Sequence, residues 1–138
     1  MLNRRHAATA LAALALLGAT GAAQAQAYPS KAIRWVVPYP AGGGSDFLAR
    51  TIGQQLSSQI SQPVLVDNKP GGNTAIAASD VARSAADGYT ILSADNGTMG
   101  FNTALYSKLS YNPEKDLVPV TLMGKFPMIL VTGPTGSG

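Results

Sequence analysis

Hydrophobic and polar positions follow two different periods along this chain, one typical of strands and one of helices. The stretch 32–39 (AIRWVVPY) is rich in β-branched and aromatic residues, which favours a strand that ends at the prolines. Apolar residues then recur at every fourth position, which is one face of a helix: Leu48, Ile52, Leu56 and Ile60. Ser45 or Asp46 is suited to cap the N-terminus of this helix.

The same alternation then repeats. Residues 63–67 (PVLVD) predict a second strand, and a turn over 68–72 leads into an alanine-rich helix over 74–86. Ile76 and Val81 are expected to face the core from that helix. Asp87-Gly88 is expected to end it, because glycine accepts the left-handed conformation found just beyond helix ends.

The last third of the chain predicts three further strands. They cover 89–94 (YTILSA), 117–123 and 128–132, and a polar loop over 95–102 leads into a short helical stretch through Leu105 and Tyr106. Strands that alternate with helices at this spacing predict an α/β fold, with a mostly parallel sheet flanked by helices.

Residues 1–27 have the composition of a secretory signal peptide. A positive start with Arg4 and Arg5 precedes the apolar run 7–17, and small residues then lead to cleavage sites at Ala25 or Ala27. The apolar run is shorter than the roughly 20 residues that a membrane-spanning helix needs. We expect export to the periplasm by the Sec route rather than the twin-arginine route, which leaves residues 28–138 as the folded part.

Composition excludes several functional classes for this folded part. Without Arg4 and Arg5 the 10 basic residues become 8, against 7 acidic ones, so the net charge is about +1 and nucleic-acid binding is not expected. Cysteine is absent, and the single histidine, His6, lies in the signal. Ser-His-Asp catalysis and histidine-ligated metals are therefore excluded, and neither a metal nor a cofactor is expected.

Three predicted loops connect a strand to the following helix, at 38–46, 68–74 and 94–100. In an open parallel sheet such loops gather at the carboxyl ends of the strands, where ligands bind. They carry glycines and short polar side chains, whose exposed backbone N–H groups can form a nest for a carboxylate. Each loop could also be a plain turn, since glycine, asparagine and aspartate are ordinary turn residues.

Nucleotide binding does not fit the first loop, PYPAGGGSDF. A phosphate-binding P-loop ends in Gly-Lys-Ser/Thr, whereas here the glycines run into Ser45 and Asp46 without a lysine. A dinucleotide fingerprint would need a third glycine where Phe47 stands, and Asp46 would repel phosphate.

Three longer segments, YPSKAIRWVVPYPAGGGSDFLAR, VDNKPGGNTAIAASDVARSAADGYTIL and NTALYSKLSYNPEKDLVPVTLM, resemble the substrate-binding proteins of tripartite tricarboxylate transporters, the Bug or TctC family. The resemblance runs from about Tyr28 to Val131. It implies a lobe of the type II periplasmic-binding-protein fold, without enzymatic activity. It also implies a small carboxylate as ligand and the membrane components of the transporter as partners.

The resemblance also implies which residues line the ligand site. In the family, the loop after the first strand and its aspartate hold a carboxylate, partly through water, and the aspartate can meet a ligand amine. The loops after the second and third strands complete the lining. The residues carried over are Tyr39, Ala41, Gly42, Gly43, Asp46, Asn68, Gly71, Gly72, Asn73, Asn96, Gly97 and Thr98.

Family members have a second lobe, and the ending GPTGSG does not resemble their continuation. We therefore expect 28–138 to be the first lobe alone, with a dissociation constant in the millimolar range or weaker, because a site closed by two lobes loses half of its contacts. The alternatives are an exported enzyme fragment with Asp46 and Asp95 as an acid–base pair, and a truncated remnant without function.

Overall fold

A three-stranded parallel sheet lies at the centre of the unit that begins at Lys31. The computed structural model describes residues 27–127, 129 and 131, so the predicted signal peptide lies almost wholly outside the described residues. β1 (Ile33–Val37) lies between β2 (Val64–Asn68) and β3 (Thr90–Leu92), and both neighbours run parallel to it. The predicted α/β class and the first three strands are confirmed; β1 and β3 are shorter than predicted, and β2 is shifted by one residue.

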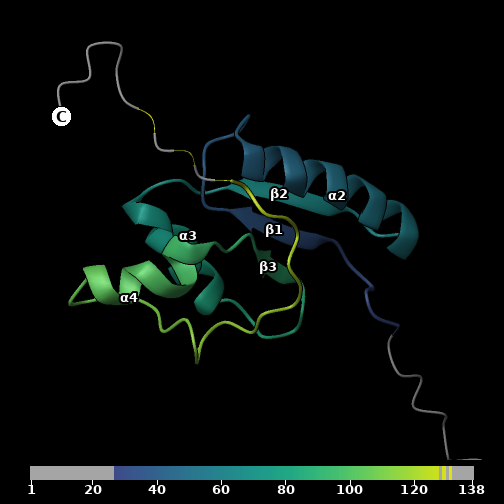
Figure 1. The fold of residues 1–138 in the computed structure, drawn as a ribbon. Helices are drawn as coiled ribbons and strands as arrows, with labels where there is room; N and C mark the ends of the chain where they lie inside the picture. The colour runs from purple at the N-terminus through teal and green to yellow at the C-terminus, as the bar shows by residue number, and fades with distance from the viewer. Residues whose placement is uncertain (1–26, 128, 130, 132–138) are drawn as a thin grey trace, which may run out of the picture. The chain divides into compact units, whose positions relative to one another are not determined.

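Helices cover both faces of the sheet (Figure 1). α2 (Gly44–Ile60) packs on β1 and β2 from one side, and α3 (Ala75–Ala82) packs on β1 and β3 from the other. Successive side chains of a strand point to opposite faces, so Trp35 and Val37 form the α2-side core together with Ala49. This alternation fixes the register of β1, since a slip of one residue would move Trp35 from the α2 face of the sheet to the α3 face.

Small residues bring α2 close to the sheet. Ala49 and Gly53 are its buried apolar positions, whereas the predicted face of Leu48, Ile52, Leu56 and Ile60 is only half-buried. A Cβ placed on Gly53 would lie 3.2 Å from Cγ1 of Val64, which is closer than ordinary van der Waals contact. The closest contact between α2 and the sheet is therefore made by Ala49 and Gly53, and the large apolar residues lie to the sides of it.

The predicted cap of α2 was wrong. Gly43 holds the cap position with extended backbone, and Ser45 and Asp46 lie inside the first turn. Asp46 reaches back instead, and its Oδ2 accepts the Gly42 N–H at 2.9 Å. Without a side chain, Gly43 makes no side-chain cap hydrogen bond, so the helix start is tied down by the carboxylate one turn along.

The second helix is shorter than predicted. A 3₁₀ turn, η1 (Gly72–Thr74), precedes α3, and α3 ends at Ala82 rather than at Asp87-Gly88. Ile76 is 54% exposed, contrary to the prediction, because α3 rests on the sheet through Ala77 and Ala78, while Val81 is half-buried. Gly88 does adopt the predicted left-handed backbone, but in the turn before β3.

The predicted polar loop over 95–102 is helical from residue 96 onward. A π-helical turn, η2 (Gly97–Phe101), runs directly into α4 (Asn102–Leu105). The carboxylate of Asp95 starts this turn, because its Oδ1 accepts the Thr98 N–H at 2.8 Å. A side-chain acceptor three residues before the N–H that it binds is typical of the start of a helix.

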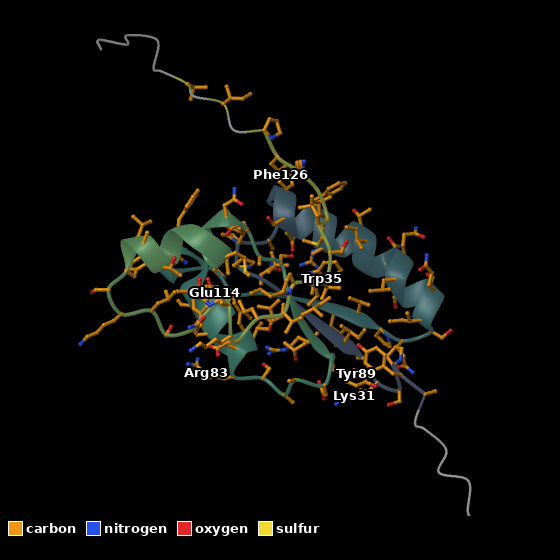
Figure 2. All side chains as sticks on the ribbon, turned by 60° about the horizontal axis from the view of Figure 1, so that its bottom comes forward. Lys31, Trp35, Arg83, Tyr89, Glu114 and Phe126 are labelled. Carbon is orange, nitrogen blue, oxygen red and sulfur yellow. The ribbon has the colours of Figure 1, made fainter. Side chains whose placement is uncertain are left out.

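The predicted strand over 117–123 was also wrong, because those residues form no strand. Val118 and Val120 are almost fully exposed, while Met123 packs against the core beneath α2. Phe126 follows, beside the first turn of α2 (Figure 2), with its ring against Gly44. The prediction over 128–132 falls largely outside the described residues.

Candidate functional site

The three predicted loops lie together at the carboxyl ends of the strands. The central loop follows β1, and the loops after β2 and β3 flank it because of the strand order β2-β1-β3. Asn68 Nδ2 donates to the Tyr39 carbonyl at 3.0 Å, and Tyr39 Oη donates to Asp95 Oδ2. One residue of the central loop is thus bonded to both flanking loops.

Asp46 is buried at the start of α2, with 4% of its surface exposed, and is surrounded by donors. Arg50 Nε donates to its Oδ2 at 3.0 Å, the Gly42 N–H donates to the same oxygen, and Asn68 Nδ2 donates to its Oδ1 at 3.0 Å. These bonds, that from Arg50 first, lower the pKa of Asp46 to about 2. The carboxylate is therefore ionised and internally neutralised at physiological pH.

Tyr39 and Asp95 form a second coupled pair across two loops. The hydrogen bond to Asp95, burial and the negative charge of Asp95 together raise the pKa of Tyr39 to about 12. Burial alone would raise the pKa of Asp95, but the hydrogen bonds from Tyr39 and Thr98 outweigh it and hold that pKa below its ordinary value. The phenol therefore stays a donor and the carboxyl stays an acceptor near neutral pH.

The second and third loops meet through buried hydroxyls. Thr98 is fully buried, and its Oγ1 donates to Thr74 Oγ1 at 2.8 Å. Gly71 and Gly72 precede Thr74 with φ values of +114° and +56°. The φ of Gly71 requires glycine there, whereas a Cβ, at 2.9 Å from Cδ1 of Ile76, would only push aside the end of an exposed side chain.

The predicted site residues divide by exposure. Most of them are exposed and present backbone or short side chains to the same edge of the sheet: Tyr39, Ala41, Gly42, Gly43, Gly71, Gly72, Asn73 and Asn96. Asn68 and Gly97 are half-buried, and Asp46 and Thr98 are buried with their polar atoms bonded within the protein. In this structure the last two therefore shape the loops.

Three residues that join the loops were missed from the sequence. Arg50 binds Asp46 and also donates from Nη2 to Asn68 Oδ1 at 3.0 Å. Asn102 and Tyr111 are buried beside Thr74 and Thr98. The four-residue spacing of Asp46 and Arg50 on a predicted helix was a usable signal, whereas nothing local marks Asn102 or Tyr111.

Two hollows lie elsewhere on the surface. One of about 640 Å³ lies between α2 and β2, lined by Arg50, Gly53 and Val64 among others, and one of about 390 Å³ lies beside α4. Neither includes a predicted site residue. Among the described residues, no group of acidic side chains is arranged to hold a metal ion, and no helix has the length and apolarity to cross a membrane.

Comparison with known proteins gives consistent matches. The family model described as the tripartite tricarboxylate transporter family receptor (TctC) matches residues 48–137. Protein BugT of Bordetella pertussis is 37% identical over 122 residues, which are 88% of this chain and 37% of that protein.

Solved structures agree with these sequence matches. MatC from Rhodopseudomonas palustris with bound malate is similar with a TM-score of 0.66 and 38% identity, over 70% of this chain and 33% of that one. R. palustris Rpa4515 with adipate gives a TM-score of 0.61 and 38% identity, over 64% of this chain and 29% of that one. The chain thus spans roughly a third of the length of these relatives. Since the family model matches more than half of the chain, the protein belongs to the tripartite tricarboxylate transporter receptor family.

Proposed function

We propose that the chain forms a carboxylate-binding lobe of a periplasmic solute-binding protein that serves a tripartite tricarboxylate transporter. The observation that carries this proposal is the joining of three glycine-containing loops at one edge of the sheet, through Tyr39, Asn68 and Thr98. Malate and adipate in the structures of two relatives support a small carboxylate as the ligand. Membership of the family supports delivery to the membrane components of such a transporter as part of the proposal.

The start of α2 supplies the positive end of the proposed site. The first N–H groups of a helix have no partner within the helix, and the helix dipole favours an anion beside them. Gly43 is exposed at this cap position and adds no side-chain acceptor. Arg50 neutralises Asp46 from within, so the nearby carboxylate repels an incoming anion less than a free one would.

An acid–base role for Asp46 and Asp95 gains no support from their surroundings. A general acid at neutral pH needs a raised pKa, whereas the pKa values of both carboxyls are lowered. The oxygens of Asp46 are taken up by Arg50, Asn68 and the Gly42 N–H. We therefore favour binding without turnover.

The proposal is tested by titrating the isotope-labelled full chain with malate and following amide shifts by NMR. We expect shifts of the amide signals of Gly42, Gly43, Gly72 and Gly97. The dissociation constant should be about 1 mM, which corresponds to a binding free energy of about −4 kcal/mol. Glycerol is a neutral control of similar size and should shift none of these amides. The proposal is wrong if malate, adipate, citrate and glutamate all leave the three loops unchanged.

Gly43→Asp separates lost binding from lost folding. The new carboxylate would cap α2, so stability should rise by a few tenths of a kcal/mol while the anion site is filled and malate binding disappears. The backbone at Gly43 is already extended, and a Cβ there meets nothing closer than 3.6 Å. Gly100→Asp is the matched control for the added charge, because a Cβ there has no neighbour within 4 Å and the residue lies in η2 rather than at the start of α2.

A further inference from the structure

Four successive residues before α3 have positive φ angles. They are Gly71 at +114°, Gly72 at +56°, Asn73 at +46° and Thr74 at +73°. Glycine adopts such backbone freely and asparagine tolerates it, but a β-branched residue there is a genuine outlier. Strained backbone of this kind persists only where the surroundings hold it, and it gathers at binding sites.

The surroundings that hold this turn come from Asn102. Its Oδ1 accepts the Asn73 side-chain N–H at 2.7 Å, and its own Nδ2 donates back to the Asn73 carbonyl at 2.7 Å. The same Nδ2 lies 3.3 Å from Thr74 Oγ1. Asn102 thus bonds both of the non-glycine residues in the left-handed turn.

Asn102 is itself fixed in place. It is fully buried at the first position of α4, and its Nδ2 also lies 3.2 Å from Tyr111 Oη, while Tyr111 donates to the Thr98 carbonyl at 2.7 Å. A buried amide with all of these partners has one orientation, because any rotation would leave polar atoms unsatisfied.

We propose that Asn102 is a positioning residue, which holds the turn Gly71–Thr74 in its left-handed form and so aims the Gly72 and Asn73 N–H groups at the carboxylate. The first N–H groups of a helical turn have no partner within the turn, which leaves them available to a ligand. This inference rests on the function proposed above. It means that Asn102, a buried side chain outside the three loops, sets the backbone geometry of the second loop.

The test compares the full chain with Asn102→Leu, Thr74→Gly and the double variant. Leucine keeps the branched shape of asparagine without its donors or acceptor, so Asn73 and Thr74 should leave the left-handed region, which NMR coupling constants report directly. Malate binding should weaken about tenfold, the scale that strain at such a turn implies. In the Thr74→Gly background the same change should weaken binding clearly less, since glycine needs no support at positive φ.

Ser79→Ala is the control, because it removes a hydrogen bond of a buried side chain, that between Ser79 and Ser110, rather than one to Asn73, Thr74 or Asn102. It should lower stability and leave both the turn and the malate affinity unchanged. If circular dichroism shows that Asn102→Leu is unfolded, Asn102→Ser is measured instead, since it leaves room for water.

The inference is overturned if Asn102→Leu keeps the left-handed turn and its affinity, or if the loss is the same in both backgrounds, as plain packing would give. Absence of any malate effect on the unchanged chain would overturn the proposed function instead. The coupling constants at Asn73 and Thr74 would still decide whether Asn102 holds the turn.

Discussion

Arg50 Nε lies 3.0 Å from Oδ2 of Asp46, one helical turn earlier on α2. The same guanidinium reaches Asn68 at the end of β2 through Nη2, so one side chain connects the helix start to the second strand. Arginine suits this role because its planar fork offers several fixed donors, which a lysine cannot reproduce. The ion pair with Asp46 and the hydrogen bond to Asn68 thereby hold the residues beside the central glycine loop in place.

The first prediction concerns acid stability. The pKa of Asp46 is about 2 in the folded protein against 3.8 without these contacts, so its contribution to stability is present above about pH 3.8 and is lost as pH falls through about 2. Arg50→Gln should raise this pKa towards 3.8, so that less stability is lost when the pH is lowered. NMR titration of the Asp46 carboxyl checks the pKa, and urea unfolding at pH values from about 5 to about 2 checks the stability.

Arg83→Gln is the charge-matched control, since Arg83 is an exposed arginine at the end of α3 (Figure 2). It should leave the titration of Asp46 unchanged. An equal effect of the two substitutions would mean that net charge, and not the Arg50 contact, sets the pKa of Asp46.

The second prediction concerns Tyr39 at high pH. Its pKa is raised from 10.0 to about 12, so the contribution of the Tyr39–Asp95 pair to stability is complete below about pH 10 and is lost as pH rises through about 12. Asp95→Asn keeps the shape and removes the charge, and it should bring the Tyr39 titration down towards 10 when ring carbon shifts are followed. A Tyr39 pKa that stays near 12 in this variant would show that burial dominates the shift.

The third prediction concerns the close approach of α2 and the sheet. Gly53→Leu should lower the free energy of unfolding by about 2 kcal/mol, because its Cβ would lie 3.2 Å from Cγ1 of Val64 and the two side chains must move apart. Gly100→Leu adds the same atoms where a Cβ has no neighbour within 4 Å, and it should cost far less. Urea unfolding of both variants gives the comparison, and equal costs would show that the contact with Val64 does not set the cost.

The fourth prediction concerns the only tryptophan. Trp35 and Ser93 are both buried, and Trp35 Nε1 donates to Ser93 Oγ at 2.9 Å across β1 and the end of β3. Ser93→Ala leaves the indole N–H without its partner and should cost about 1–3 kcal/mol in unfolding experiments. In a Trp35→Phe background the donor is already gone, so the same serine change should cost much less; an undiminished cost there would assign the effect to packing.

Much of the fold follows from local pattern in the sequence. The β-branched run of β1 and the four-residue apolar period of α2 predicted these elements, because side-chain direction repeats every two residues in a strand and every 3.6 in a helix. The meeting of the three loops was predictable too, since parallel strands present their carboxyl ends at one edge. The glycines at 71 and 88 were recognisable as turn residues, and both have positive φ.

Tertiary contacts decided what local pattern could not encode. Asp46 was expected to cap α2 and instead accepts from Arg50 and from Asn68, 22 residues away. Thr74 adopts backbone that its own side chain disfavours, because buried Asn102 bonds the turn from 28 residues further along. A sequence determines the period of each element and the donors it carries. Which donor meets which acceptor depends on the packing of distant segments, and that pairing sets the charge and geometry of the site.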